Sequence, residues 1–124
     1  MGKVLIVENN NLNLKLFYDL LMTKKCEVVT SRDGVGVTEI ASKEKSDLIL
    51  TDIQLNDGIS GINLIKALKK NTVTKYIPII AITAFVMKND EVEISKSGCD
   101  IYLSKPVSID SFFKAIDNLS TQNP

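Results

Sequence analysis

The chain of 124 residues contains no histidine and only two cysteines, Cys26 and Cys99, which lie far apart in the sequence. These absences leave no ligand set for a structural zinc ion and no Cys/His or Ser/His pair for nucleophilic catalysis. The apolar content of 44% is enough for a single domain to build its core without disulfides. We therefore expect both thiols to be buried and reduced.

An excess of charge of one sign is also absent, because fifteen basic and fifteen acidic residues cancel at pH 7. Arg32 is the only arginine, so we expect no nucleic-acid partner. No apolar run approaches the roughly 20 residues that cross a bilayer, and the run after Lys3 is too short for a secretory signal. We expect a cytoplasmic protein without a membrane partner, in which the lysine pairs at 24–25 and 69–70 are solvated helix ends.

Short runs rich in Val and Ile alternate with longer segments of helical periodicity along the whole chain. The predicted strands are 3–7, 27–30, 47–51, 78–82 and 100–103, and the predicted helices are 10–23, 35–44, 62–68, 88–97 and a last helix capped by Ser108. This alternation predicts one α/β domain, 1–124, with a flavodoxin-like (βα)5 fold. Its parallel sheet is doubly wound, and the expected strand order is 2-1-3-4-5.

Polar residues follow four of the predicted strands at the edge of the sheet where such folds bind ligands. They are Glu8 and Asn9, Asp52, Thr83, and Lys105. Neighbouring carboxylates repel each other and favour a hard divalent cation such as Mg²⁺, and a lysine completes the charge balance. The set suits phosphoryl transfer, in which Asp52 is the nucleophile and the cations and the threonine hydroxyl stabilise the phosphoryl oxygens.

At these residues the sequence resembles the receiver domain of two-component response regulators. The matching segments are 4–10, 47–52, 82–84 and 102–106, in the family's order and near its spacing. Within the family, their details are most similar to single-domain regulators of cell division. The resemblance implies a stand-alone receiver without an output domain, which signals through contacts with a downstream protein. It promotes only its own phosphorylation and dephosphorylation, as a monomer or weak dimer.

The resemblance also implies a role for each site residue. Asp52 would accept the phosphoryl group from a sensor histidine kinase or phosphotransfer protein. Glu8, Asp52 and the backbone carbonyl of Gln54 would hold Mg²⁺, while Thr83 and Lys105 would contact the phosphoryl oxygens. The ring of Tyr102 would swing inward when Thr83 moves, and the peptide bond between Lys105 and Pro106 would be cis.

Two departures from the family pattern concern the phosphorylation site. Asn9 stands where the family usually has a second acid, so only a neutral oxygen can bind the metal there, weakly or through water. Asn56 replaces a usual proline after Asp52, and Gly61 comes one residue late, as if a residue near 57–58 were inserted. We expect weaker magnesium binding and an altered loop beside Asp52.

Other functions remain open from the sequence. Asn9 raises the alternative of a pseudo-receiver that acts unphosphorylated. A magnesium-dependent aspartyl phosphohydrolase is a weaker alternative, because Gln54 occupies the place of its usual general acid. A flavin carrier is weaker still, because Glu8 lies where a phosphate would need backbone amides and hydroxyls. Residues 85–87 together with Ile94 could form a partner-binding face, although core positions are the commoner role of such residues.

Overall fold

A computed structural model describes residues 2–32, 34–54, 60–84 and 88–122 of the chain. Strands and helices alternate throughout this part, as the sequence periodicity predicts. In chain order they are β1 (Lys3–Val7), α1 (Asn11–Thr23), β2 (Glu27–Ser31), α2 (Val37–Lys43), β3 (Leu48–Asp52), α3 (Gly61–Lys70), β4 (Ile79–Thr83), α4 (Lys88–Ser97), β5 (Ile101–Ser104) and α5 (Ile109–Gln122). The last three strands begin one residue later than predicted, and Pro78 lies just outside β4 because it has no N–H to donate to the sheet.

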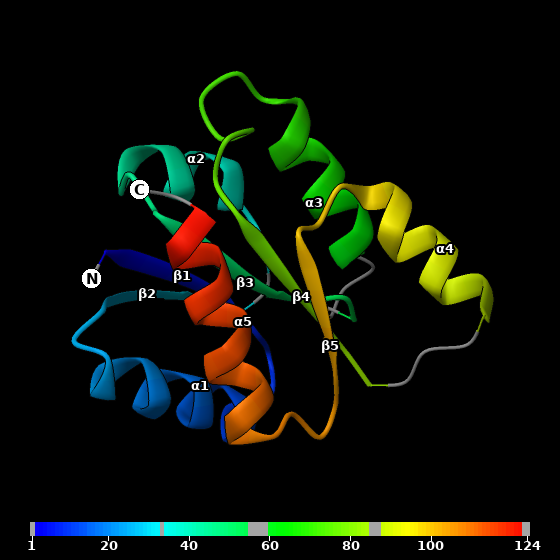
Figure 1. Cartoon of the computed structure of the whole chain (residues 1–124). Coiled ribbons are helices and arrows are strands. Elements are labelled where there is room, and N and C mark those ends of the chain that lie inside the picture. Colours follow the sequence, from blue (N-terminus) through cyan, green and yellow to red (C-terminus); the bar gives the residue numbers. More distant parts are fainter. Residues whose placement is uncertain (1, 33, 55–59, 85–87, 123–124) are drawn as a thin grey trace.

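The strands form one parallel sheet in the order β2-β1-β3-β4-β5, which confirms the predicted topology. Figure 1 shows α1 and α5 on one face of this sheet and α2, α3 and α4 on the other. β2 lies on one side of β1, whereas β3 and β4 follow on the other side, so the strand order changes direction between β1 and β3. Because the strands are parallel, β1, β3 and β4 end side by side at one edge of the sheet. This edge is where a doubly wound fold places its ligands.

Both faces of the three central strands are buried, which explains why their sequences are nearly continuous apolar runs. Successive side chains of a strand point to opposite faces, so alternate residues enter two separate hydrophobic clusters. Val4, Ile6 and Leu50 pack with α1 and α5, whereas Leu5 and Ile49 pack with α2 and α3. On the α1/α5 face the rings of Phe17 and Phe112 stack with their centroids 5.5 Å apart.

Side chains and glycine define several helix ends. The side-chain oxygens of Asn10, Ser60 and Ser108 each accept a hydrogen bond from the backbone N–H three residues further on, at 3.0, 3.4 and 3.1 Å. Gly98 follows α4 with a φ of +98°, a left-handed conformation that favours glycine. The capping role predicted for Ser108 is confirmed.

The two cysteines differ in burial. Cys26 is buried before β2 and Cys99 is only half-buried before β5, at opposite edges of the sheet, and both are free thiols. The prediction of two buried reduced thiols is therefore right for Cys26 and wrong for Cys99, whose edge position leaves it partly open to solvent. Burial raises the pKa of both thiols, which favours the protonated form at neutral pH.

The sequence analysis expects the lysine pairs at 24–25 and 69–70 to be solvated helix ends, but the structure shows ion pairs at two of these lysines. The ammonium of Lys24 lies 3.3 Å from the carboxylate of Asp117, and that of Lys69 lies 3.1 Å from Asp100. The second lysine of each pair is exposed. The expectation is wrong for the first lysine of each pair, because tertiary packing brings an acid from a distant part of the chain beside it.

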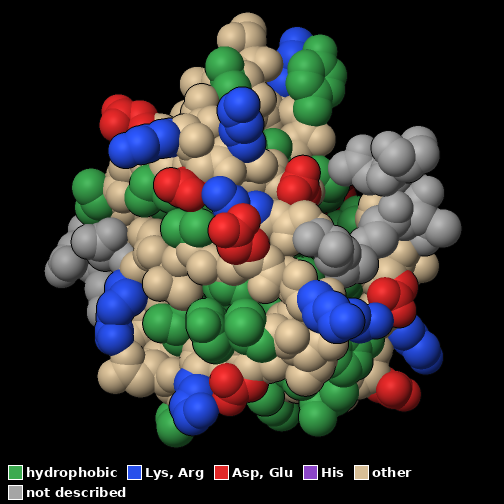
Figure 2. All heavy atoms as spheres, turned by 90° about the vertical axis from the view of Figure 1, so that its left-hand side faces the viewer, with side chains coloured by type: hydrophobic (Ala, Val, Ile, Leu, Met, Phe, Trp, Pro, Cys, Tyr) green, Lys and Arg blue, Asp and Glu red, His purple; other side chains and the backbone are tan. Residues whose placement is uncertain are grey.

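The outer surface mixes charges of both signs. Figure 2 shows the face on which α2 and the edge strand β2 lie, where basic and acidic side chains are interspersed with apolar ones. None of the helices in the described part of the chain is long and apolar enough to span a bilayer.

Candidate functional site

The predicted site residues come together at the carboxyl edge of the sheet. Glu8 directly follows β1, Asp52 ends β3 and Thr83 ends β4, so three adjacent strands deliver these side chains. Lys105 follows β5, and its backbone N–H donates a hydrogen bond of 2.7 Å to the carbonyl of Thr83. The parallel register thus brings residues from four separate segments to the same edge of the sheet, as the sequence analysis predicts.

The ammonium of Lys105 lies between the two carboxylates. Its Nζ is 2.8 Å from Asp52 Oδ2 and 3.4 Å from Glu8 Oε1. The other carboxylate oxygen of Asp52, Oδ1, accepts a hydrogen bond of 2.9 Å from the backbone N–H of Gln54. Lys105 therefore neutralises part of the negative charge, and Gln54 fixes the orientation of the Asp52 carboxylate.

Both carboxylates are almost inaccessible to solvent, with Glu8 1% and Asp52 3% exposed. The pKa of Glu8 is raised to about 7, first by burial and then by the hydrogen bond with Asp52 and the charge of Asp52, against the opposing effects of the Asn10 N–H and of Lys105. For Lys105, burial lowers the pKa but the hydrogen bond with Asp52 and the two negative charges outweigh it, so its pKa is raised. Two buried carboxylates thus share one lysine, which cannot balance both of them when Glu8 is ionised.

The unbalanced charge fits a divalent cation. Glu8 Oε1 is buried and accepts no hydrogen bond within the described part of the chain, and it faces Lys105 only at 3.4 Å. Carboxylate and amide oxygens are ligands that Mg²⁺ prefers. Within residues 2–32, 34–54, 60–84 and 88–122, no group of three Asp, Glu, His or Cys side chains is arranged to hold a metal ion, and the residue after Glu8 is the neutral Asn9.

The start of α3 lies close to the end of β3 at Gly61. The Gly61 N–H donates a hydrogen bond of 2.9 Å to the carbonyl of Ile53, and a Cβ at position 61 would lie only 2.3 Å from the Asp52 carbonyl oxygen. Only glycine permits this approach. Gln54 and Ser60 pair in a single antiparallel bridge. The insertion predicted near 57–58 lies outside the described residues, between the two ends joined by this bridge.

Thr83 and Tyr102, the two residues predicted to form a switch, lie on the neighbouring strands β4 and β5. Thr83 is buried, and Tyr102 is half-buried against the hydrophobic cluster shared with α2, α3 and α4. The peptide bond between Lys105 and Pro106 is cis, as the family resemblance implies. Of the candidate partner face, Ile94 is 1% exposed and belongs to the core, whereas residues 85–87 lie outside the described part of the chain.

Arg32 is a site contact that the sequence analysis did not identify. Its guanidinium donates a hydrogen bond of 3.0 Å to the carbonyl of Asn9 and another to the side chain of Asn11. These bonds hold the segment that follows β1, including Asn9, against the end of β2. The available signal was the position of the chain's only arginine, directly after β2 at the carboxyl edge of the sheet.

Comparison with known proteins identifies the family. The sequence profile of the response regulator receiver domain matches residues 4–117, so the chain belongs to the receiver domain family of two-component signalling systems. Among characterised relatives, the chain is similar to the polar-differentiation response regulator DivK of Brucella anthropi. The two are 44% identical over 113 residues, which cover 91% of each chain.

Solved structures share the fold. The receiver domain of the sensor histidine kinase PA1611 from Pseudomonas aeruginosa, which has a magnesium ion in its active-site cleft, superposes with a TM-score of 0.85. It is 24% identical, and the match covers 94% of this chain and 95% of that one. The chemotaxis response regulator CheY4 of Vibrio cholerae gives a TM-score of 0.87 at 24% identity, with 96% and 98% of the two chains covered. These likenesses show a receiver fold.

Proposed function

We propose that Asp52 accepts a phosphoryl group from a sensor histidine kinase or a phosphotransfer protein, and that this chain acts as a stand-alone receiver in a phosphorelay. The strongest support is that Lys105 contacts both Asp52 and Glu8, whose carboxylates are almost fully buried. A purely structural ion pair would leave one buried acid unnecessary, because one lysine balances one carboxylate. The second acid makes sense when more positive charge enters the pocket.

In the proposed transfer, a carboxylate oxygen of Asp52 attacks the phosphorus atom of a phosphohistidine. The new O–P bond forms as the P–N bond breaks. The electron pair of the broken P–N bond stays on the imidazole nitrogen of the donor, which then takes up a proton. The ammonium of Lys105, already 2.8 Å from Asp52, is placed to stabilise charge on the phosphoryl oxygens. The hydroxyl of Thr83, at the end of the neighbouring strand, would bind a second phosphoryl oxygen.

Glu8, Asp52 and the backbone carbonyl of Gln54 would hold Mg²⁺, with the side-chain oxygen of Asn9 as a weak or water-mediated ligand. The bound ion would supply positive charge for the phosphoryl oxygens. The orphaned Oε1 of Glu8 and its raised pKa support this assignment, since a cation would stabilise the ionised form. Arg32 helps by holding Asn9 in place through the Asn9 carbonyl.

Phosphorylation would change the protein's binding to a downstream protein. Movement of Thr83 toward the phosphoryl group would free space for the ring of Tyr102, which would shift the population of two conformations. On this proposal the protein works in the cytoplasm, and like its DivK relatives it regulates cell differentiation or division through protein contacts. It promotes only its own phosphorylation and dephosphorylation and catalyses no reaction on other molecules.

Asn9 supports one second candidate, a pseudo-receiver that binds its partners without phosphorylation. The lost acid removes one attraction for the metal, and Lys105 already occupies Asp52 Oδ2 in the unphosphorylated protein. In this case Asp52 would serve as the ion-pair partner of Lys105 and would not react.

Incubation with acetyl phosphate and magnesium, followed by mass spectrometry, separates the two candidates. We expect the intact protein to gain the mass of one phosphoryl group, and Asp52→Asn to gain none. A peptide map should assign the adduct to Asp52. If the protein stays unmodified at saturating magnesium with acetyl phosphate and with a phosphorylated histidine phosphotransfer protein, the pseudo-receiver replaces the phosphoacceptor.

A further inference from the structure

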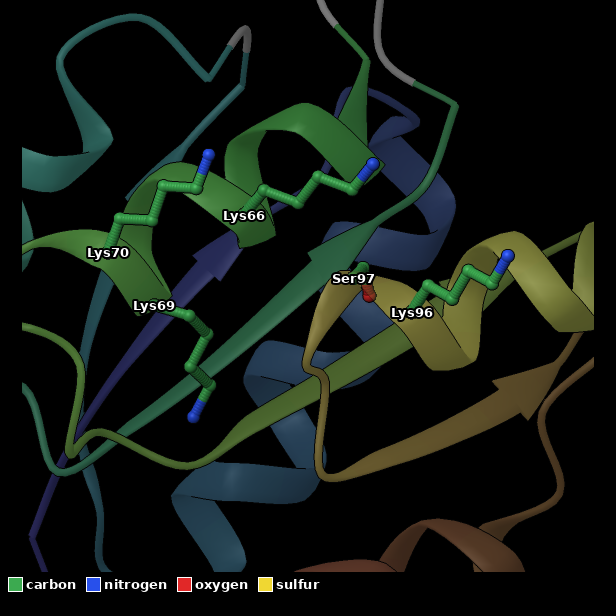
Figure 3. A pocket seen from close by; sticks show the side chains of 5 residues that line it. All are labelled: Lys66, Lys69, Lys70, Lys96 and Ser97. Atoms are coloured by element: carbon green, nitrogen blue, oxygen red, sulfur yellow. The ribbon is translucent and has the colours of Figure 1, made fainter.

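A hollow of about 330 Å³ lies between α3 and α4, away from the phosphorylation site. Its lining consists of three lysines of α3, one lysine of α4 and one serine, namely Lys66, Lys69, Lys70, Lys96 and Ser97. Figure 3 shows that the side chain of Lys69 extends toward the strands, whereas those of Lys66 and Lys70 extend away from Lys69. None of these lining residues is acidic, in a protein whose total charge is zero.

The hollow is at the edge of the sheet opposite to Asp52. Lys69 Nζ donates to the carbonyl of Ile77 at 3.1 Å and pairs with Asp100 at the same distance. Ile77 and Asp100 come just before β4 and β5, whereas Asp52 and Thr83 end their strands. A ligand in this hollow would therefore not compete directly with the phosphoryl group.

Of the four lysines that line the hollow, Lys69 alone forms an ion pair within the described part of the chain. No ion pair in the described part of the chain involves Lys66, Lys70 or Lys96. Because the side chain of Lys69 is bound to Asp100, the other three lysines that line the hollow supply the positive charge left for a ligand.

Lysines in the last turn of a helix often serve only to balance the helix dipole, but that role does not account for this group. Intrachain donors already reach the terminal carbonyls. The Ala67 and Leu68 carbonyls of α3 accept hydrogen bonds from the Asn71 N–H at 3.2 Å and the Thr74 hydroxyl at 2.7 Å, and the Ile94 carbonyl of α4 accepts one from the Ser97 hydroxyl. The C-terminal ends of the two helices carry about half a negative charge each, so the three positive charges of the lysines exceed the charge that they could balance there.

We propose that this hollow between α3 and α4 binds a compact anion that carries several phosphate groups. Its volume is at the lower end of small-molecule sites, so it admits a short phosphate chain. No aromatic side chain lines it, so nothing there would stack on a nucleobase. Lysines present flexible point charges, which suit phosphate oxygens and impose little geometry.

Binding of inorganic triphosphate to the full chain without magnesium tests the proposal. Isothermal titration calorimetry at low salt should give a one-to-one complex, and amide NMR shifts should concentrate in α3 and the end of α4. The triple variant Lys66→Gln/Lys70→Gln/Lys96→Gln should bind at least about tenfold more weakly, because each charge near the surface contributes a modest factor. Lys69 is kept because it holds Asp100.

The matched control Lys25→Gln/Lys43→Gln/Lys114→Gln removes the same total charge from exposed positions elsewhere. It should change triphosphate affinity by less than about twofold. Equal weakening in both triple variants would overturn the proposal, since binding would then reflect net charge alone. It is also overturned if triphosphate does not bind, if the shifts centre on Thr83 and Lys105, or if an Asp/Glu-rich peptide binds this hollow and triphosphate does not.

Discussion

Lys105 Nζ lies 2.8 Å from Asp52 Oδ2, although 53 positions separate the two residues in the chain. Asp52 is 3% exposed, so its carboxylate depends on Lys105 and on the Gln54 N–H for compensation. This ion pair joins the end of β3 to the segment after β5. The stability of the unphosphorylated protein and the reactivity of Asp52 are therefore linked through the same ammonium group.

Replacing Lys105 by methionine should destabilise the protein at pH 8, because two buried carboxylates then repel without a cation between them. Removal of one partner from a buried pair costs roughly 3–5 kcal/mol, and the partial exposure of Lys105 reduces this to about 2–3 kcal/mol. The loss should be smaller at pH 5, where Glu8 is protonated. Urea unfolding at both pH values measures it, with Lys114→Met as the control. A loss that is equal at both pH values would contradict this explanation.

The raised pKa of Glu8 predicts how stability depends on pH without magnesium. A carboxyl whose pKa is about 7 in the folded protein and near 4.5 in the unfolded chain binds its proton more tightly in the folded state. The free energy of unfolding should therefore fall as pH rises from about 4.5 to 7, by at most about 3 kcal/mol, and then level off.

Thermal or urea unfolding between pH 4 and 8 checks this dependence. In Glu8→Gln the fall should largely disappear, because the amide does not titrate. The matched control Glu93→Gln removes an exposed carboxylate from α4 and should keep it. Identical pH profiles for the natural protein and Glu8→Gln would show that Glu8 is not the group responsible.

Asn9→Asp should bind magnesium more tightly than the natural protein. The substitution adds a third carboxylate beside Glu8 and Asp52, and a unit charge near a divalent cation contributes a few kcal/mol before desolvation is subtracted. We expect a gain of roughly tenfold in affinity, and phosphorylation of Asp52 at lower magnesium concentration. Calorimetric titration measures the affinity. Asn118→Asp, on the exposed side of α5, makes the same charge change away from the site and serves as the control. Equal or tighter binding by the natural protein would refute the electrostatic argument.

Gly61→Ala should destabilise the protein by about 2–3 kcal/mol, near the upper end of the usual range for overpacking. The new Cβ would meet the Asp52 carbonyl oxygen at 2.3 Å and the Ile53 Cα at 2.5 Å, and backbone atoms cannot swing aside. Because this contact positions the segment beside Asp52, phosphorylation should slow as well. Asn63→Ala, exposed in the same helix, is the control for helix propensity. Unchanged stability in Gly61→Ala would mean that the start of α3 shifts away from β3 at little cost.

The sequence by itself determined the order of elements and the edge of the sheet where the site lies. Continuous apolar runs such as Val4–Val7 are buried on both faces, and capping residues such as Asn10 and Ser108 act within a few residues. These signals are local, because strand and helix periodicity and capping depend on neighbouring positions. The topology then follows from the crossover rule for parallel strands, so Glu8, Asp52, Thr83 and Lys105 were predictable as one group.

Only the tertiary structure decided which of these groups touch and which surface residues are paired. Examples are the contacts of Lys105 with two acids, of Arg32 with the Asn9 carbonyl and of Lys69 with Asp100. The partners are 23 to 97 positions apart in the sequence, yet their atoms lie within a few ångströms of each other.

 Such separations carry no periodic signal, so no local pattern reports them. Each distance depends on the strand register, the helix packing and the side-chain rotamers together, and these become definite only when the whole chain has folded. The half-exposure of Cys99 and the close approach of Gly61 to Asp52 were decided in the same way, by packing at a sheet edge and at the start of a helix.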